Sequence, residues 1–426
     1  MAKDLSLVDH LMNVKDAELI SYDVMQLKSN NIIILDVIPA QTHLCPHCGR
    51  ICPGYDYAAK EPRLWRHLDW GGTLVMLRYR PRRINCPEHK VVTEAVPWAY
   101  HNTRLTKAFE EQILWHVQTS SRQATSRIMR IDWHTSDTCV DRFLQREGNG
   151  TQSSRFDGLE HIAIDETSYQ KRHKYVTCVL NQDNNTIVWV GKGHGLETIK
   201  QFFEALTPAQ KTSIKTVSGD GARWIDTCVE TYVPHAKRCA DPFHVTLWVS
   251  ASLDKVRVRS SKALSNEGKK ADAKKVKGSQ IALGKDPSDL TDNQKEKVEF
   301  IANTTPELHK CYKDKEKLRK ILSMKGNKEE AICALDDWIT QISSSETPEY
   351  KELAEKISRH RQNICNSIIY GRHSAHLEAA NNGIKLIIRR GYGFRNTDNL
   401  ANHIKFCCSS AKIELTYQTH HAVVAV

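Results

Sequence analysis

Two acidic residues follow apolar runs that have the character of buried strands. Residues 162–164 precede Asp165, and residues 213–218 lead into Gly219-Asp220-Gly221. An acidic residue at the end of a buried strand lies at the edge of a sheet, and glycines let a ligand approach the backbone closely. A plainer alternative is a carboxylate that solubilises a strand edge or closes a tight turn. Two carboxylates at neighbouring strand ends can bind Mg²⁺, so Asp165 and Asp220 are candidate metal ligands.

A third carboxylate lies in residues 374–394, which predict a helix with two distinct faces. At about 100° per residue, one face carries apolar residues, namely Leu377, Ala380, Ile384 and Ile387. Another face carries polar residues, namely Glu378, Asn382, Lys385 and Arg389. This order is typical of a metal ligand followed by a phosphate clamp. The alternative is an ordinary solvated face.

Cysteine and histidine form two knuckles near the amino terminus. Cys45-Pro-His-Cys48-Gly and Cys86-Pro-Glu-His89 together offer the four ligands of a closed tetrahedral Zn²⁺ site. His47 or Cys52 could replace one of these ligands, and two unrelated pairs of buried side chains are the alternative. Residues 65–79 between the knuckles predict a hairpin that turns at Gly71-Gly72. Four arginines crowd the second arm, as on a module that contacts phosphates: Arg78, Arg80, Arg82 and Arg83.

Residues 106–145 change to a helical period and predict three short helices. The first buries Phe109, Ile113 and Val117, the second is capped by Ser120-Ser121, and the third starts at about Ser136. The tight connection between the last two predicts a helix-turn-helix, although any small three-helix bundle gives the same pattern. As a recognition helix, the third would expose Thr135, Asp137, Thr138, Asp141 and Arg142.

The candidate acidic residues require a sheet to position them. The apolar run 162–164 and two segments rich in β-branched and aromatic residues, 175–180 and 186–190, predict a three-stranded meander with a turn at Asn184-Asn185. A helix, a strand ending at Asp220, a second helix and a strand over 236–240 follow, so the predicted order is βββαβαβ. Residues 246–368 are instead helical and charged. Between Lys255 and Lys277 there are nine basic and two acidic residues, on a solvated surface or along DNA.

Composition restricts the class of protein further. The chain has 426 residues and a net charge of +11, which favours several folded domains and a polyanionic partner such as nucleic acid. No apolar run approaches the length of a membrane helix, and the first residues lack a signal-peptide core. We therefore expect a cytoplasmic protein whose thirteen cysteines are thiols or metal ligands.

Taken together, Asp165, Asp220 and Glu378 resemble the DDE triad of transposases with an RNase H-like fold. More narrowly, the order and spacing of the motifs resemble the ISL-three family of bacterial insertion-sequence transposases over nearly the whole chain. The resemblance includes Asp241-Pro-Phe-His244 and the segment from Glu378-x-x-Asn381 to Arg389-Arg390-Gly-Tyr-Gly-Phe394. It departs at His89, where a cysteine is expected.

The resemblance implies a multidomain α/β protein with an RNase H-like core that a helical insertion interrupts. The expected parts are an N-terminal segment (1–40), a zinc-binding module (41–95), a helix-turn-helix (100–150), the first part of the core (155–245), a basic helical insertion (246–368) and a closing part with the catalytic glutamate (369–426).

The resemblance also implies phosphoryl transfer on DNA with Mg²⁺ or Mn²⁺ held by Asp165, Asp220 and Glu378. Asp241, His244 and Asn381 would support the site, while Lys385, Arg389 and Arg390 would hold DNA. The zinc module and the helix-turn-helix, through Thr135, Thr138 and Arg142, would bind terminal inverted repeats. A dimer or higher oligomer on DNA and a nucleoid-associated location in a bacterium are expected. The competing interpretations are a DNA-binding regulator without catalysis and an RNase H-like nuclease.

Overall fold

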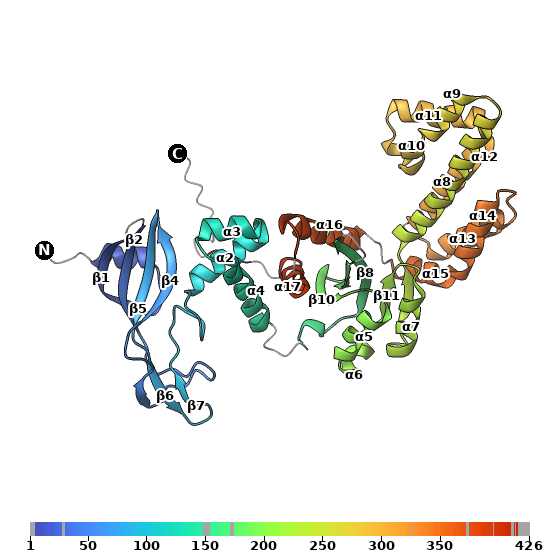
Figure 1. Cartoon of the computed structure of the whole chain (residues 1–426). Coiled ribbons are helices and arrows are strands. Elements are labelled where there is room, and N and C mark those ends of the chain that lie inside the picture. Colours follow the sequence, from blue (N-terminus) through green and yellow to red (C-terminus); the bar gives the residue numbers. More distant parts are fainter. Residues whose placement is uncertain are drawn as a thin grey trace. The chain divides into compact units, whose positions relative to one another are not determined.

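A computed structural model describes residues 5–27, 30–147, 154–170, 174–324, 326–371, 375–394, 396–409, 413 and 415. The chain forms two compact units, one that runs to Phe143 and one from Leu144 to Ser410 (Figure 1). Within these described parts, none of the helices combines the length and apolar character needed to span a bilayer.

The first unit contains a four-stranded sheet in the order β1-β2-β5-β4. Its elements are α1 (Leu5–Met12), β1 (Ala17–Leu27), β2 (Asn30–Pro39), β4 (Arg63–Trp70) and β5 (Thr73–Tyr79). The predicted hairpin is confirmed, since β4 and β5 pair antiparallel across a turn in which Gly71 has φ +58°. Strand β1 was not predicted, because Ile20, Val24 and Met25 are exposed and the strand lacks a clean apolar alternation.

A small three-stranded sheet of order β3-β6-β7 carries the cysteine knuckles. It consists of β3 (Gly54–Tyr57), β6 (Arg82–Cys86) and β7 (Lys90–Thr93). Three helices follow: α2 (Lys107–Thr119), α3 (Arg122–Met129) and α4 (Trp133–Glu147). Ser121 caps α3 as predicted, accepting a hydrogen bond from the Ala124 amide. A three-residue turn separates α3 from α4, so α4 begins at Trp133 and earlier than expected.

The second unit contains a five-stranded sheet of order β10-β9-β8-β11-β12. Its strands are β8 (His161–Gln170), β9 (Lys174–Asn181), β10 (Thr186–Lys192), β11 (Thr216–Gly219) and β12 (Lys237–Ala240). The first three pair antiparallel, while β11 pairs parallel with both β8 and β12. The helices are α5 (Leu196–Ala205), the unpredicted α6 (Pro208–Ser213) and α7 (Arg223–Tyr232). The predicted βββαβαβ order is otherwise confirmed.

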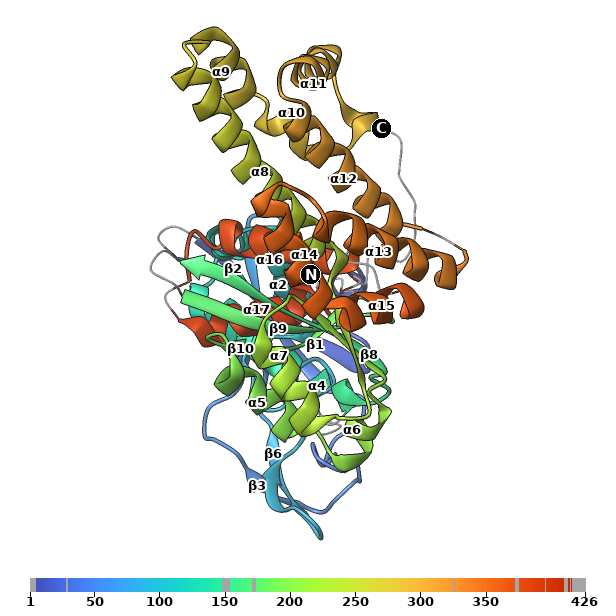
Figure 2. The same cartoon turned by 90° about the vertical axis from the view of Figure 1, so that its right-hand side faces the viewer.

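Helices cover both faces of this sheet (Figures 1 and 2). Ile162 and Ile164 pack with α5 and α7, through Phe202 and Ile225 among others. Ala163 packs on the opposite side, against α16 (Ala375–Arg390) and α17 (Thr397–Cys407). Because side chains alternate along a strand, Asp165 belongs to the same face of β8 as Ala163 and is directed toward α16.

Between β12 and α16 lies a region that is almost entirely helical. It comprises α8 (Pro242–Asn266), α9 (Lys270–Lys277), α10 (Gln280–Gly284), α11 (Asp292–Thr304), α12 (Pro306–Leu322), α13 (Lys328–Ser343), α14 (Pro348–Arg359) and α15 (Arg361–Tyr370). Figure 1 shows α8 leading away from the sheet and α15 returning beside it. Leu335 and Trp338 are fully buried in its core, as predicted, and Val256 and Val276 of the basic stretch belong to the same core.

Candidate active site and zinc module

The ligand atoms of Cys45, Cys48, Cys86 and His89 all lie within 4.8 Å of one another. The Cys48 and Cys86 sulfurs are 3.7 Å apart, and His89 Nδ1 is 3.7 Å from the Cys45 sulfur and 3.6 Å from that of Cys86. A tetrahedron of zinc ligands has edges of about 3.8 Å between sulfurs and about 3.5 Å between sulfur and nitrogen. The spacing and the donor types therefore fit Zn²⁺.

The backbone around the knuckles favours thiolate ligands. Hydrogen bonds from the backbone around His89 lower the pKa of Cys86 to about 6, because an amide donor stabilises the thiolate. Gly49 has φ +70° and donates its amide to the Cys45 carbonyl, which closes the first knuckle. Cys52 lies nearby, but burial raises the pKa of its thiol and its sulfur contacts the Arg50 carbonyl. The geometry favours His89 as the fourth ligand.

The basic arm of this module is only partly available to DNA. Arg78 bridges Asp36 and Asp23, so it belongs to the ion pairs of the four-stranded sheet. Arg80 and Arg82 are exposed and both lie over the Tyr57 ring, at 4.1 and 4.7 Å from its centroid. These two guanidinium groups remain candidates for phosphate contact.

The three helices differ from the prediction in which side chains they expose. Thr138 is exposed on α4 as predicted, whereas Thr135 and Asp141 are half-buried. Asp137 is buried in an ion pair with Arg122, so the expectation that it is exposed was wrong. Arg142 donates to the fully buried Glu110, and this pair holds α4 against α2. The role of Arg142 in DNA binding stays a prediction, in addition to its structural role in the ion pair with Glu110.

Strand register brings the first two acidic residues to one level of the sheet. Thr216 pairs with His161 and Ser218 with Ala163 in parallel β11 and β8. Continued two residues beyond the Ser218–Ala163 pair, past the end of β11, this register brings Asp220 level with Asp165. The expectation that Asp165 ends its strand is wrong, because β8 continues to Gln170 against β9. The open edge arises because β11 stops at Gly219.

Asn381 of α16 connects this edge to the closing helix. Its amide nitrogen donates to Asp165 Oδ2, and its carbonyl oxygen accepts from the Thr167 hydroxyl at 3.2 Å. The turn after α16 is held by Gln170, which donates to the Phe394 carbonyl at 2.8 Å. The Phe394 ring lies where a Cβ of Gly391 would be, 2.3 Å away, so only glycine fits there. These contacts give a structural reason for the Gly-Tyr-Gly-Phe segment.

The other predicted residues of the closing helix are placed as follows. Lys385 and Arg389 are exposed, Arg390 is half-buried, and Ala380, Ile384 and Ile387 pack on the sheet as predicted. The side chains of Leu377 and Glu378 lie outside the described residues, although α16 includes both positions.

Asp241 and His244 lie at the start of α8. Asp241 is buried and caps the helix by accepting from the Phe243 amide at 3.0 Å. His244 Nε2 is 3.8 Å from Asp241 Oδ2. Asp241 directly follows β12, whose Ala240 pairs with Gly219, so it adjoins the same edge as Asp220. Both residues therefore border the acidic edge, as expected of supporting residues.

Electrostatics at this edge fit a cation. Burial raises the pKa of the Asp165 carboxyl, the Asn381 hydrogen bond and a positive charge on His244 oppose the rise, and the Asp220 charge adds to it. Burial likewise raises the pKa of Glu166, whose Oε1 accepts from the Gly195 amide at the start of α5. Clustered carboxylates that are costly to ionise together suit a divalent cation with oxygen ligands. The donor set therefore fits Mg²⁺ or Mn²⁺.

Sequence comparison decides the family. One family model, described as a transposase, matches residues 162–404, and a second, described as the zinc-finger of transposase IS204/IS1001/IS1096/IS1165, matches 41–89. A third, described as the helix-turn-helix domain of transposase family ISL3, matches 94–135. The chain belongs to the ISL3 family of transposases. The resemblance seen in the sequence is confirmed, including the order of zinc ribbon, helix-turn-helix and DDE transposase domain.

Individual ISL3 relatives match along most of their length. The transposase for insertion sequence element IS1557 of Mycobacterium tuberculosis is 37% identical over 375 residues, which cover 84% of this chain and 83% of that protein. The transposase for insertion sequence element IS1001 of Bordetella parapertussis is 25% identical over 361 residues, covering 84% and 87%. The chain is thus an enzyme of the transposase class that combines DNA-binding and catalytic domains.

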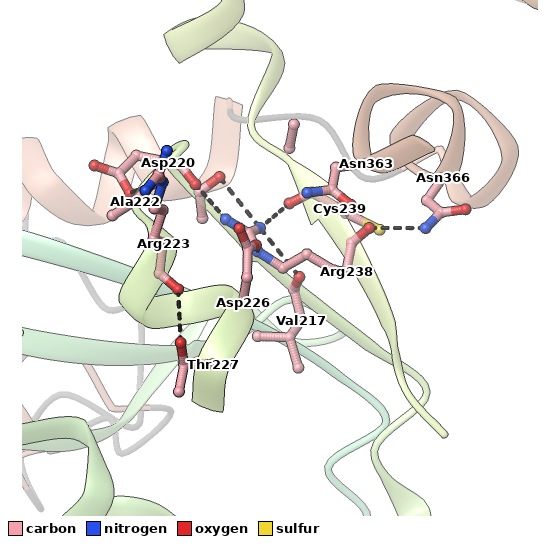
Figure 3. Close-up of polar contacts among 12 residues, drawn as sticks. Val217, Asp220, Ala222, Arg223, Asp226, Thr227, Arg238, Cys239, Asn363 and Asn366 are labelled. Carbon is pink, nitrogen blue, oxygen red and sulfur yellow. Dashed lines mark hydrogen bonds and ion pairs between the residues drawn. The ribbon is translucent and has the colours of Figure 1, made fainter. Parts of the chain in front are cut away.

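Two residues near the site were missed in the sequence. Thr167 helps to hold Asn381, and Arg238 lies buried next to the Asp220 loop (Figure 3). The sequence contains a signal for Arg238: it is a charged residue inside the short strand predicted over 236–240. The residues that follow it there, Cys239 and Ala240, are buried. A buried arginine generally has a specific set of acceptors.

The zinc module yields a first prediction. We expect Cys86→Ser to reduce bound zinc from about one ion per chain to near zero, because a hydroxyl replaces a thiolate ligand. His89→Cys should retain zinc, since it completes a four-cysteine site, and Cys52→Ser is the matched control that also retains it. Atomic emission on purified protein measures the ratio. Zinc loss in Cys52→Ser with retention in Cys86→Ser would refute the assignment.

Asp165 yields a prediction about stability and pH. Its raised pKa means that the folded state binds a proton more readily than the unfolded chain, whose carboxyl has its ordinary value of 3.8. The free energy of unfolding of the metal-free protein therefore falls as the pH rises from 3.8 through the higher pKa that Asp165 has in the folded state. Asp165→Asn should melt higher than wild type at about pH 8, and the gap should narrow toward about pH 5. Glu230→Gln, at an exposed position, should show no such trend.

Proposed function

We propose that the enzyme cleaves DNA at the ends of its insertion sequence and joins them to target DNA, using divalent metal held by Asp165, Asp220 and Glu378. The observation that carries the proposal is the parallel register of β11 with β8, which continues into the loop after β11 so that Asp220 comes level with Asp165, together with the hydrogen bond from Asn381 of α16 to Asp165. Glu378 precedes Asn381 by three residues, so the two positions share a face of α16.

We propose further that the sheet and its helices form an RNase H-like core. Counted from β8, the strand order is 3-2-1-4-5, with three antiparallel strands followed by two parallel ones. The helical region from α8 to α15 separates β12 from α16, as an insertion into that core would. Its bounds lie within a few residues of those expected from the sequence. The other expected domain limits are retained as part of this proposal.

The bound metals, Mg²⁺ or Mn²⁺, would activate water or a DNA 3′-hydroxyl and stabilise the departing oxygen. The protein's own residues supply position. Asp165, held by Asn381, would bind the metal together with Asp220 and Glu378. Asp241 and His244 would fix the start of α8 beside the site. No serine or tyrosine nucleophile and no covalent enzyme intermediate are needed, because the attacking oxygen comes from water or DNA.

DNA would be held by three surfaces. Lys385, Arg389 and Arg390 follow Glu378 along α16 and would hold the phosphates of the cleaved strand. Thr135 and Thr138 of α4 would contact the terminal inverted repeats, with Arg142 at the edge of that surface. The zinc module would contact the neighbouring phosphates. Because two element ends must be processed together, the active form on DNA would be at least a dimer, located at the bacterial nucleoid in the cytoplasm.

Cleavage of a labelled DNA that carries the element's own ends tests this function. With Mg²⁺, wild type should cut at the element boundary, and Asp220→Ala and Glu378→Ala should each lower cleavage by roughly a thousandfold or more. Binding of the ends should persist in both variants, because the DNA-binding domains are intact. Binding without cleavage by wild type would instead favour a regulator, and cleavage that ignores the repeats would favour a general nuclease.

The proposed phosphate clamp has its own test. Replacing both Lys385 and Arg389 by Ala should lower cleavage at limiting DNA about tenfold or more, because two charge-assisted contacts to the strand are lost. Replacing Lys200 and Lys211 by Ala removes the same charge from α5 and α6 on the other side of the sheet and is the control. Unchanged cleavage in the Lys385/Arg389 variant would refute the clamp.

A further inference from the structure

Arg238 is a buried cation directly beneath the loop that carries Asp220. Its side chain, in β12, is only 8% exposed. Figure 3 shows the guanidinium group directed at the end of β11 and at α7. Nε donates to Asp226 Oδ1 at 3.0 Å, and Nη1 lies 3.4 Å from the carbonyl oxygens of both Val217 and Gly219. The remaining contacts are from Nη1 to the Cys239 carbonyl and from Nη2 to the Asp220 carbonyl.

Burial of the Arg238 guanidinium costs free energy of solvation, which its partners must offset. Burial lowers the pKa of Arg238, and Asp226 and Asp220 only partly offset the effect of lost solvation. Among the residues that the structure describes, Asp226 pairs its carboxylate with the guanidinium, and the other hydrogen bonds go to main-chain carbonyls. These carbonyls surround the end of β11, and Gly219 already accepts from the Asp241 amide at 2.9 Å, so Arg238 adds donors to the backbone where the ladder of hydrogen bonds stops. A planar fork of donors can reach several of them at once, which an ammonium group cannot do.

The loop is fixed on its other sides as well. Gly219 lies so close to β8 that a Cβ would be 3.1 Å from the Ile164 carbonyl oxygen and 2.8 Å from Cδ1 of Ile225. The Ala222 amide donates to Asp220 Oδ1 at 2.9 Å. Asp220 therefore has its carbonyl held by Arg238 and its carboxylate held by its own loop. Movement of the guanidinium would change the direction of that carboxylate.

Helix α15 holds the main chain of β12 at Arg238 and Ala240. The Asn366 side-chain amide donates to the Arg238 carbonyl at 2.8 Å, and the Ser367 hydroxyl donates to the Ala240 carbonyl at 2.5 Å. Both side chains are buried, with exposures of 7% and 2%. The end of the helical region thus fixes β12, and β12 in turn fixes the Asp220 loop.

We propose that Arg238 is a positioning residue that sets the direction of the Asp220 carboxylate and thereby the affinity of the site for divalent cations. This proposal rests on the proposed role of Asp220 as a metal ligand. Arg238 touches neither DNA nor metal in this scheme. It acts through the main chain of the loop.

Binding of Mn²⁺ to the zinc-loaded protein, followed by electron paramagnetic resonance without DNA, provides a readout that is independent of turnover. Arg238→Lys keeps the charge but loses the fork, and it should weaken Mn²⁺ binding about tenfold, the lower range for residues that orient metal ligands. Binding of the element ends should stay unchanged. Lys237→Gln, at the exposed neighbouring position of β12, is the matched control and should bind Mn²⁺ like wild type.

A double-mutant cycle separates positioning from general damage. If Arg238 acts through Asp220, then Arg238→Lys should cause no further loss of Mn²⁺ affinity when added to Asp220→Asn. An additive loss would overturn the proposal, and so would wild-type affinity in Arg238→Lys. Should Arg238→Lys fail to fold, Asp226→Asn, which releases Nε, is judged by the same criteria. If Asp220→Asn itself leaves Mn²⁺ affinity unchanged, the proposed function fails, not only this inference.

Discussion

The parallel pairing of β8 with β11 is the constraint on which the acidic edge depends. Because Thr216 pairs with His161, the chain reaches Asp220 at the level where β8 reaches Asp165. A shift of one residue would turn one of these carboxylates to the opposite face of the sheet, among the apolar side chains of α5 and α7. The register is secured by burial on both faces, since Ile162 and Val217 pack on one side and Ala163 on the other. Packing that looks unrelated to chemistry therefore determines whether two carboxylates meet.

Much of the fold could be predicted because its signals are local. The strands around Asp165, the helices after Gly195 and Ala222, the hairpin at Gly71 and the cap at Ser121 each follow from a few adjacent residues. What could not be predicted is which elements become neighbours. Asp165 was expected at a strand end, whereas β9 extends the pairing of β8 beyond it. Asp137 was expected in solvent because its own helix pattern exposes it, but Arg122 of the preceding helix covers it.

The helical region from α8 to α15 buries residues of its basic stretch, which could not be predicted from the sequence either. Its basic stretch reads as polar in the sequence, yet Val256, Leu264 and Val276 lie in a shared core with Trp338. The apolar residues are few, and the core that they enter includes partners from α12 and α13 that are distant in the sequence, such as Trp338. Arg257 in this stretch is also buried and donates to the Lys277 carbonyl at 2.7 Å. Composition therefore described the surface of the region and not its interior.

The histidine in the second knuckle has a consequence for long-range electrostatics. Zinc bound by three thiolates and a neutral imidazole leaves one unit of negative charge at the centre, whereas four thiolates would leave two. The exposed guanidinium groups of Arg80 and Arg82 both lie over Tyr57, in β3 of the same small sheet. With a less anionic centre, less of their positive potential is cancelled, so the sheet repels a polyanion less as it approaches.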